Sequence, residues 1–197
     1  MRRTLALALV LAGATLSAQD FTGGLYTGLS LPVGDLKDKA GCGTNQFLGT
    51  HLGGHLDFII TPHHEVRAHI TYQYLPGSDW GSYYGNATND FKTLQFGADW
   101  VYHFQNPNLG WYTVAGATVN SLKDEWSYTN GAGTSVGGSS SQSGRFGVRG
   151  GGGYTFNKWF SVEGTLNQVM VDKNGSDGFG FDTATWLQAS AVFRFGK

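Results

Sequence analysis

Eight segments of this 197-residue chain alternate apolar and polar residues with a period of two. Successive side chains of a β-strand point to opposite sides, so the alternation predicts strands with one apolar and one polar face. The composition agrees, since 31 glycines and 14% aromatic residues favour strands over helices. The eight segments lie at residues 21–31, 46–60, 65–74, 93–104, 110–122, 144–156, 159–169 and 188–197.

The last segment, "QASAVFRFGK", shows that the alternation alone does not say whether the apolar face is buried in a core or faces lipid. Phe193 and Phe195 share the apolar face with two alanines, and Arg194 lies on the opposite face. A soluble sandwich would bury the apolar face, whereas a membrane barrel would turn it toward lipid. The fifth segment, "GWYTVAGATVNSL", is the least clear, because Tyr112 and Val114 compete for the apolar face with Trp111, Ala115, Ala117 and Val119.

The connections between the segments alternate in length. Three are short, "TPHH", "QNPNLG" and "NKW", and four are long, at residues 32–45, 76–90, 121–143 and 172–183. Short turns on one side, long loops on the other and an even strand number are the layout of bacterial outer-membrane barrels. The third long connection contains the low-complexity run "GAGTSVGGSSSQSG", which we expect to be a mobile loop.

Aromatic residues gather at the ends of the segments that face the short turns. Rings of this kind favour the headgroup level of a membrane, so they predict a periplasmic aromatic girdle. The last strand would then pair with the first and leave no open edge in the bilayer. The predicted girdle comprises Phe58, Trp100, Tyr102, Phe104, Trp111, Tyr112, Tyr154, Phe156, Trp159, Phe160, Phe193 and Phe195.

The N-terminal residues have the pattern of an export signal. Arg2 and Arg3 precede an apolar run from Leu5 to Ala14, which small residues follow. We therefore expect a signal peptide at 1–18 and one barrel domain at 19–197, with no run after the signal long enough for a transmembrane helix. The single cysteine, Cys42, excludes an internal disulfide, and a net charge of -1 gives no electrostatic reason for nucleic acid as a partner.

With these features, the chain resembles the small outer-membrane β-barrel superfamily, the group of the OmpA transmembrane domain and OmpX. The resemblance covers essentially the whole mature chain and rests on the signal, the eight segments, "RGGGGYTF" and the terminal "AVFRF". It implies an eight-stranded antiparallel up-and-down transmembrane barrel. It also implies contact with outer-membrane lipid and recognition by the barrel-assembly machinery through Phe193 and Phe195. The chain departs from the group by ending in Phe195-Gly196-Lys197.

Charges of both signs fall on the polar faces of the segments. An eight-stranded barrel is narrow and filled by side chains, so we expect these charges to pair as a plug inside it, rather than to line an ion path. Three inward histidines, His51, His55 and His69, lack a diagnostic metal-binding spacing, and we assign no metal or cofactor. The expected charge network comprises Asp57, Arg67, Asp99, Arg145, Arg149, Glu163 and Arg194.

The long loops carry aromatic residues among glycine, serine and asparagine, a composition used by adaptable recognition surfaces. The alternative is that some of these rings only anchor the outer membrane interface. No Gly-x-Ser-x-Gly or HExxH sequence is present, and we expect no enzyme activity. The recognition candidates are Trp80, Tyr83, Tyr84, Trp126, Tyr128, Phe179 and Phe181.

The expected function is structural or an adhesion-like interaction with an unidentified extracellular ligand or surface. A narrow channel or transporter for small solutes is the alternative. A secreted lipocalin-like binder and a lipid-modifying barrel enzyme are weaker alternatives, the former because a lipocalin lumen should be apolar, whereas the polar face here carries glycine and charge.

Overall fold

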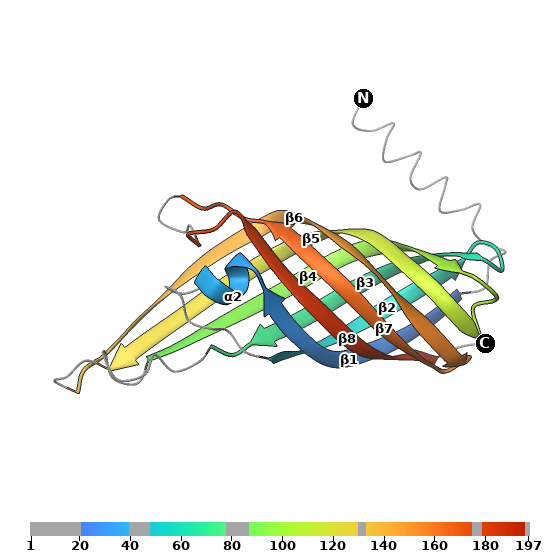
Figure 1. Ribbon diagram of the computed structural model, residues 1–197, viewed down its shortest axis with the longest axis horizontal. Helices are drawn as coiled ribbons and strands as arrows, with labels where there is room; N and C mark the ends of the chain where they lie inside the picture. The colour runs from blue at the N-terminus through green and yellow to red at the C-terminus, as the bar shows by residue number, and fades with distance from the viewer. Residues whose placement is uncertain (1–20, 40–47, 78–86, 130–132, 175–178, 196–197) are drawn as a thin grey trace, which may run out of the picture.

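The computed structural model shows a closed β-barrel (Figure 1). It describes residues 21–39, 48–77, 87–129, 133–174 and 179–195; the expected signal peptide, Cys42, Trp80, Tyr83 and Tyr84 lie outside these ranges. Within the described residues, no helix has the length and apolar character to cross a membrane.

Eight strands and one short helix make up the fold. The helix, α2 (Asp35–Lys39), follows the first strand directly. The strands are β1 (Phe21–Val33), β2 (Gly49–Ile59), β3 (His64–Leu75), β4 (Ala87–His103), β5 (Gly110–Thr129), β6 (Ser135–Asn157), β7 (Phe160–Met170) and β8 (Thr183–Phe195).

Each strand pairs antiparallel with its neighbours in the sequence, and β1 pairs antiparallel with β8 to close the barrel. The closing register runs from Gly23 opposite Phe195 to Val33 opposite Thr185. Closure gives the backbone amides and carbonyls of both terminal strands a partner, as a bilayer requires. The expected eight-stranded antiparallel up-and-down barrel is confirmed.

The outer wall is apolar and the inner wall is polar. Leu52, Phe96 and Leu166 are each about half exposed on the outside, while Asp57, Gln95 and Asn167 are buried on the inside. An aqueous surface does not carry so continuous an apolar band, which matches the lipid-facing wall of a transmembrane barrel. The charges and amides of the barrel interior do not fit the lipocalin-like alternative, whose lumen should be apolar.

Aromatic rings form a chain of contacts around the end of the barrel where the three short turns lie. Tyr154 contacts both Trp111 and Phe156, with ring centroids 5.1 and 4.9 Å apart, and Phe160 joins Phe156 to Phe193 at 5.7 and 5.5 Å. These contacts join five residues of the expected girdle, and one other predicted member does not face outward. Tyr112 is 1% exposed and points into the barrel.

The inward position of Tyr112 resolves the ambiguous fifth segment. Tyr112 and Val114 are buried in the lumen, and the competing set that includes Trp111 faces outward. Room for the ring comes from the glycine run of β6, since a Cβ on Gly153 would lie 2.4 Å from the Tyr112 ring. Between Arg149 and Thr155, the lumen side of "RGGGGYTF" carries only glycine, and at Gly153 it accommodates the aromatic ring from the neighbouring strand β5.

The third long connection differs most from the sequence expectation. Residues 121–143 were expected to be a loop, but β5 continues to Thr129 and β6 begins at Ser135, so most of "GAGTSVGGSSSQSG" is strand. The two strands pair as far as Thr129 opposite Ser135. With the upper part of β4 they form a sheet that extends beyond the other strands (Figure 1). We call residues 87–91, 124–129 and 135–141 the extension.

A bulge explains why the extension was missed. Between Asn120 and Leu122 the β5–β6 register shifts, and β6 takes one additional residue. Gly144 lies in this stretch with a φ of 70°, the left-handed conformation that suits glycine. An added residue moves the alternation of β6 to the opposite phase, so Phe146 faces outward and Gln142 faces inward.

A charge placed on the outer wall tests the lipid-facing assignment. Leu52→Arg should lower the free energy of unfolding by about 2–4 kcal/mol, because the side chain lies near the middle of the apolar band. The same change at Leu31, near the opposite end of β1 from the girdle residue Phe21, should cost about 0–1 kcal/mol. Urea unfolding in phospholipid vesicles measures both values, and equal costs at the two depths would contradict the assignment.

Candidate functional site

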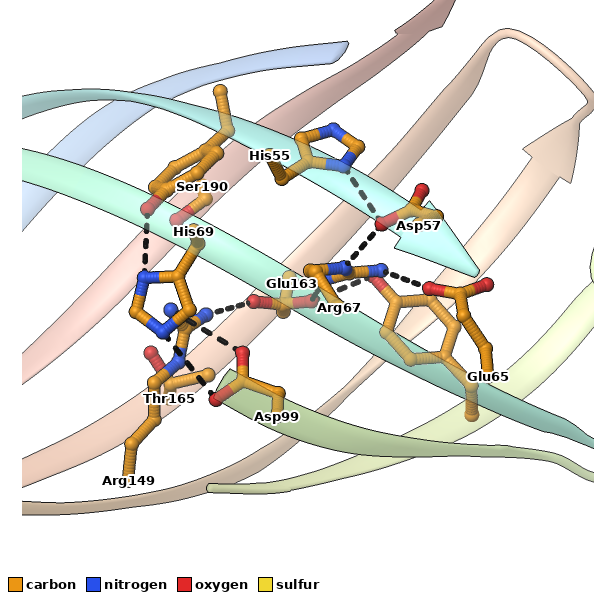
Figure 2. A network of polar contacts seen from close by, with 12 residues as sticks. His55, Asp57, Glu65, Arg67, His69, Asp99, Arg149, Glu163, Thr165 and Ser190 are labelled. Carbon is orange, nitrogen blue, oxygen red and sulfur yellow. Dashed lines mark hydrogen bonds and ion pairs between the residues drawn. The ribbon is translucent and has the colours of Figure 1, made fainter. Parts of the chain in front are cut away.

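A network of charged side chains crosses the lumen near the aromatic girdle (Figure 2). At its centre Arg67 contacts three carboxylates from two other strands and its own. Its Nε donates to Asp57 Oδ1 at 3.0 Å, its Nη1 to Glu163 Oε2 at 2.7 Å and its Nη2 to Glu65 Oε1 at 3.2 Å. The guanidinium carbon also lies 5.9 Å from the centre of the Tyr112 ring. The three carboxylates thus supply the hydrogen-bond acceptors and counter-charges that a buried guanidinium requires.

Two further arginines contact the carboxylates around Arg67. Arg149 of β6 donates to Glu163 and lies 3.6 Å from Asp99 Oδ2. Arg194 of β8 contacts Asp57 at 3.2 Å and Glu65 at 3.7 Å. The network therefore joins β2, β3, β4, β6, β7 and β8 across the barrel axis and fills this part of the lumen.

The network includes residues that sequence reasoning missed. Glu65 contacts Arg67 and Arg194, although it was not among the candidates. Its signal was available, since it lies two residues before Arg67 in the same alternation. His103 lies 3.1 Å from Glu65, and Tyr112 donates to Glu163 at 3.1 Å.

The structure does not place Arg145 in this network, contrary to the sequence expectation. Its side chain pairs with Asp172, at the end of the barrel opposite the girdle. Arg145 lies one residue from the bulge of β6, where the inward-facing positions reach the rim of the lumen. The other six candidates, Asp57, Arg67, Asp99, Arg149, Glu163 and Arg194, are brought together.

The inward histidines are held by different partners. His55 Nδ1 lies 2.8 Å from Asp57, and His69 Nε2 lies 3.4 Å from Asp99. His51 lies between two hydroxyl groups, 2.9 Å from Ser30 and 2.8 Å from Ser190. These contacts describe packed lumen side chains, and among the described residues no group of three or more His, Cys, Asp or Glu is arranged to hold a metal ion.

Above the charge network the lumen becomes neutral. An amide chain crosses the barrel, in which Gln188 donates to Gln73 at 2.9 Å and Asn167 donates to Gln188 at 3.1 Å. An apolar cluster then fills the mouth, and helix α2 contributes Leu36 to it. We call this cluster the cap; its members are Leu36, Leu75, Phe91, Leu122, Val169, Val171, Phe179, Phe181, Ala184 and Trp186.

The cap corrects two of the recognition candidates. Phe179 and Phe181 were expected to be loop residues open to a ligand, but they are 7% and 1% exposed. Phe179 contacts Phe91 edge-on with ring centroids 5.8 Å apart, and it stacks on Phe181 at the same distance. The segment before β8 brings both side chains into the narrow, apolar mouth. There they pack against the other cap residues and close the lumen.

Trp126 and Tyr128 lie on the extension, beyond the cap. Both belong to the face of β5 that continues the inner wall, since Leu122 on the same face is a cap residue. Trp126 is 40% exposed and therefore remains on the surface. The two recognition candidates of β5 thus lie directly above the closed mouth.

The opposite face of the extension carries a cluster of charges at its base. Lys92 and Lys123 face each other across β4 and β5, and Glu125 pairs with both. Hydrogen bonds from Lys123 and Lys92 lower the pKa of Glu125 to about 2. The carboxylate thus remains ionised at neutral pH and offsets the repulsion between the two lysines.

Together the fold and the lumen define a transmembrane β-barrel with a filled interior and a sheet that extends above it. No protein-family model matches the sequence. No curated protein matches it either.

Solved structures show the same fold. The barrel matches Ail, the attachment invasion locus protein of Yersinia pestis, with a TM-score of 0.54 at 13% identity, covering 89% of this chain and 99% of that one. Ail in complex with the heparin analogue sucrose octasulfate gives 0.52 at 15% identity and the same coverage. The N-terminal β-barrel domain of Pseudomonas aeruginosa OprF gives 0.45 at 14% identity, covering 90% of this chain and 98% of that one. The two Ail structures confirm the fold expected from the resemblance to small outer-membrane barrels.

Removing the central carboxylate tests the role of the network. Glu163→Gln should lower the free energy of unfolding by about 3–5 kcal/mol, because Arg67 and Arg149 would lose a shared buried counter-charge. Tyr112→Phe, which removes a hydrogen bond to the same carboxylate but no charge, should cost about 1 kcal/mol. Denaturant unfolding in vesicles gives both values. Similar costs for the two variants would mean that the ion pairs contribute no more than an ordinary hydrogen bond.

Proposed function

We propose that this protein is an outer-membrane surface protein that contacts an extracellular ligand or surface through the extension. The observation that carries the proposal is the sheet of β4, β5 and β6, which continues beyond the lipid-facing band while the rest of the barrel ends at the cap (Figure 1). A strand ladder of this length holds exposed side chains in a fixed geometry above the membrane.

The free edge of the extension supports contact with another molecule. Residues Ser135–Ser141 of β6 pair with β5 on one side, whereas β7 pairs with β6 only from Gly147 onward. Among the described residues no strand pairs with the second side of Ser135–Ser141. An edge without lysine or proline lacks two common protections against pairing with another chain.

The position in the cell is part of the same proposal. Residues 1–18 would direct export, and the barrel would sit in outer-membrane lipid with the short turns in the periplasm. Phe193 and Phe195, which lie at the girdle end of β8, would be read by the barrel-assembly machinery. Ail, the attachment invasion locus protein of Yersinia pestis, has been crystallised with a heparin analogue, which supports an extracellular role for this fold.

The filled lumen favours this proposal over a channel or transporter. The charge network, the amide chain and the cap follow each other along the barrel axis, and each layer joins strands on opposite sides. A solute path would have to separate buried ion pairs, which is strongly unfavourable. The proposal is non-enzymatic, because its contact surface is the extension and not a reactive group in the lumen.

Shortening the extension tests the function. Replacing residues 124–140 by a two-residue Asn-Gly turn should leave the barrel folded, because Lys123 and Ser141 already lie opposite each other in the ladder of β5 and β6. Cells that express the shortened protein should bind extracellular-matrix-coated or epithelial-cell surfaces several-fold less than cells with the full chain. A heat-dependent mobility shift on a denaturing gel checks that the barrel has formed. Equal binding by folded full-length and shortened proteins would contradict the proposal.

A further inference from the structure

Trp126 and Tyr128 are neighbouring aromatic residues with parallel rings on the inner face of the extension. Their ring planes are parallel to within 13°, and their centroids lie 6.1 Å apart. This separation is close to the roughly 6.7 Å between successive residues on one face of a strand, so the rings follow each other along β5. We call these two residues the platform.

The backbone beside the platform is bare, and the tryptophan lies over it. Gly138 of β6 is directly opposite Trp126, and a Cβ placed on Gly138 would lie 2.6 Å from the indole ring. The absence of a side chain at this position allows the indole to lie flat against the sheet. β5 is also paired on both sides at this height, with Asn89 of β4 opposite Trp126, so the platform has a rigid support.

The charges around the platform limit the ligands that it can accept. On the inner face of the extension the described residues include one charged side chain, Asp124, and no lysine or arginine. Lys92 and Lys123 belong to the opposite face. A sulfated or phosphorylated ligand would find no lysine or arginine on this face to pair with. The favoured ligand is therefore neutral.

We propose that the platform binds a neutral sugar ring of an extracellular glycan, stacked on Trp126 and Tyr128. The proposal rests on the proposed function and names the ligand class. An aromatic face carries partial negative charge and attracts the C–H groups on the flat side of a pyranose. On the same face of β6, Val136 lies opposite Tyr128, and Ser140, opposite Asp124, presents a hydroxyl group next to Gly138 for the hydroxyl groups at the ring edge. Tyrosine and tryptophan supply such contact area with little loss of side-chain entropy.

Calorimetry on the full-length protein tests the inference. The protein is reconstituted in phosphocholine nanodiscs, because a maltoside detergent would itself present sugar rings. The probes are chitohexaose, maltohexaose and a sulfated heparin hexasaccharide. We expect at least one neutral hexasaccharide to bind with a dissociation constant below the millimolar range. No binding of either neutral probe, or tighter binding of the sulfated one, overturns the proposal.

Three variants assign binding to the platform. Trp126→Ala and Tyr128→Ala should each weaken binding about tenfold, equivalent to about 1.4 kcal/mol. Gly138→Val keeps both rings but forces the indole away from the sheet, and it should weaken binding to a similar extent. Trp159→Ala removes a tryptophan at the opposite end of the barrel and should leave binding unchanged. Unchanged affinity in the three platform variants overturns the proposal, as does a platform that binds a tryptophan-containing decapeptide but neither neutral sugar.

The adhesion assay separates this inference from the proposed function. If the shortened extension abolishes adhesion while Trp126→Ala and Gly138→Val adhere normally, the extension mediates contact but the sugar platform is wrong. If adhesion is independent of the extension, the proposed function fails. The calorimetric result then decides by itself whether the platform binds a neutral sugar.

Discussion

Every backbone amide and carbonyl within a bilayer must find a partner in the protein, and the rest of this structure depends on that constraint. The antiparallel pairing of β1 with β8 satisfies it by removing both edges of the sheet. Closure with eight strands sets a narrow interior. The narrow interior in turn limits the volume of the side chains that fill it, which is why the inner wall combines glycine with charged and amide residues. Gly153, whose missing side chain makes room for Tyr112, is one instance of this fit.

The filling is ordered along the barrel axis. Ion pairs centred on Arg67 lie near the girdle, amides such as Gln188 lie above them, and the apolar cap closes the mouth. Each layer couples strands that are far apart in the sequence, so the interior supports the circular shape in addition to the backbone ladder. The surface available for recognition is then limited to the part of the chain above the cap. This separation places the interactions that stabilise the barrel inside it and the proposed contact surface outside it.

The sequence predicted the barrel because alternation with a period of two is dictated by strand geometry over most of the chain. It also predicted which charges face inward, since Arg67, Glu163 and Arg149 lie on regular alternating segments. Prediction failed where that regularity stops. The bulge that contains Gly144 changes the phase of β6, so the alternation did not predict strands in the extension. For the same reason Arg145 was assigned to the charge network instead of the rim of the lumen. Phe179 and Phe181 resemble loop aromatics in sequence, and only the three-dimensional position of the mouth shows that they bury themselves in it.

The continuity of β5 from the girdle to the extension has a mechanical consequence. A molecule attached to the extension pulls on strands that run through the barrel wall, where β5 pairs with β4 on one side and β6 on the other. The inter-strand hydrogen bonds lie across the strand direction, so tension along β5 loads many of them in shear at once. An attachment of this kind resists detachment far better than a flexible loop, because the hydrogen bonds at the ends of a loop can break one after another. Under the proposed function, the barrel would act as the anchor that carries the tension into the membrane.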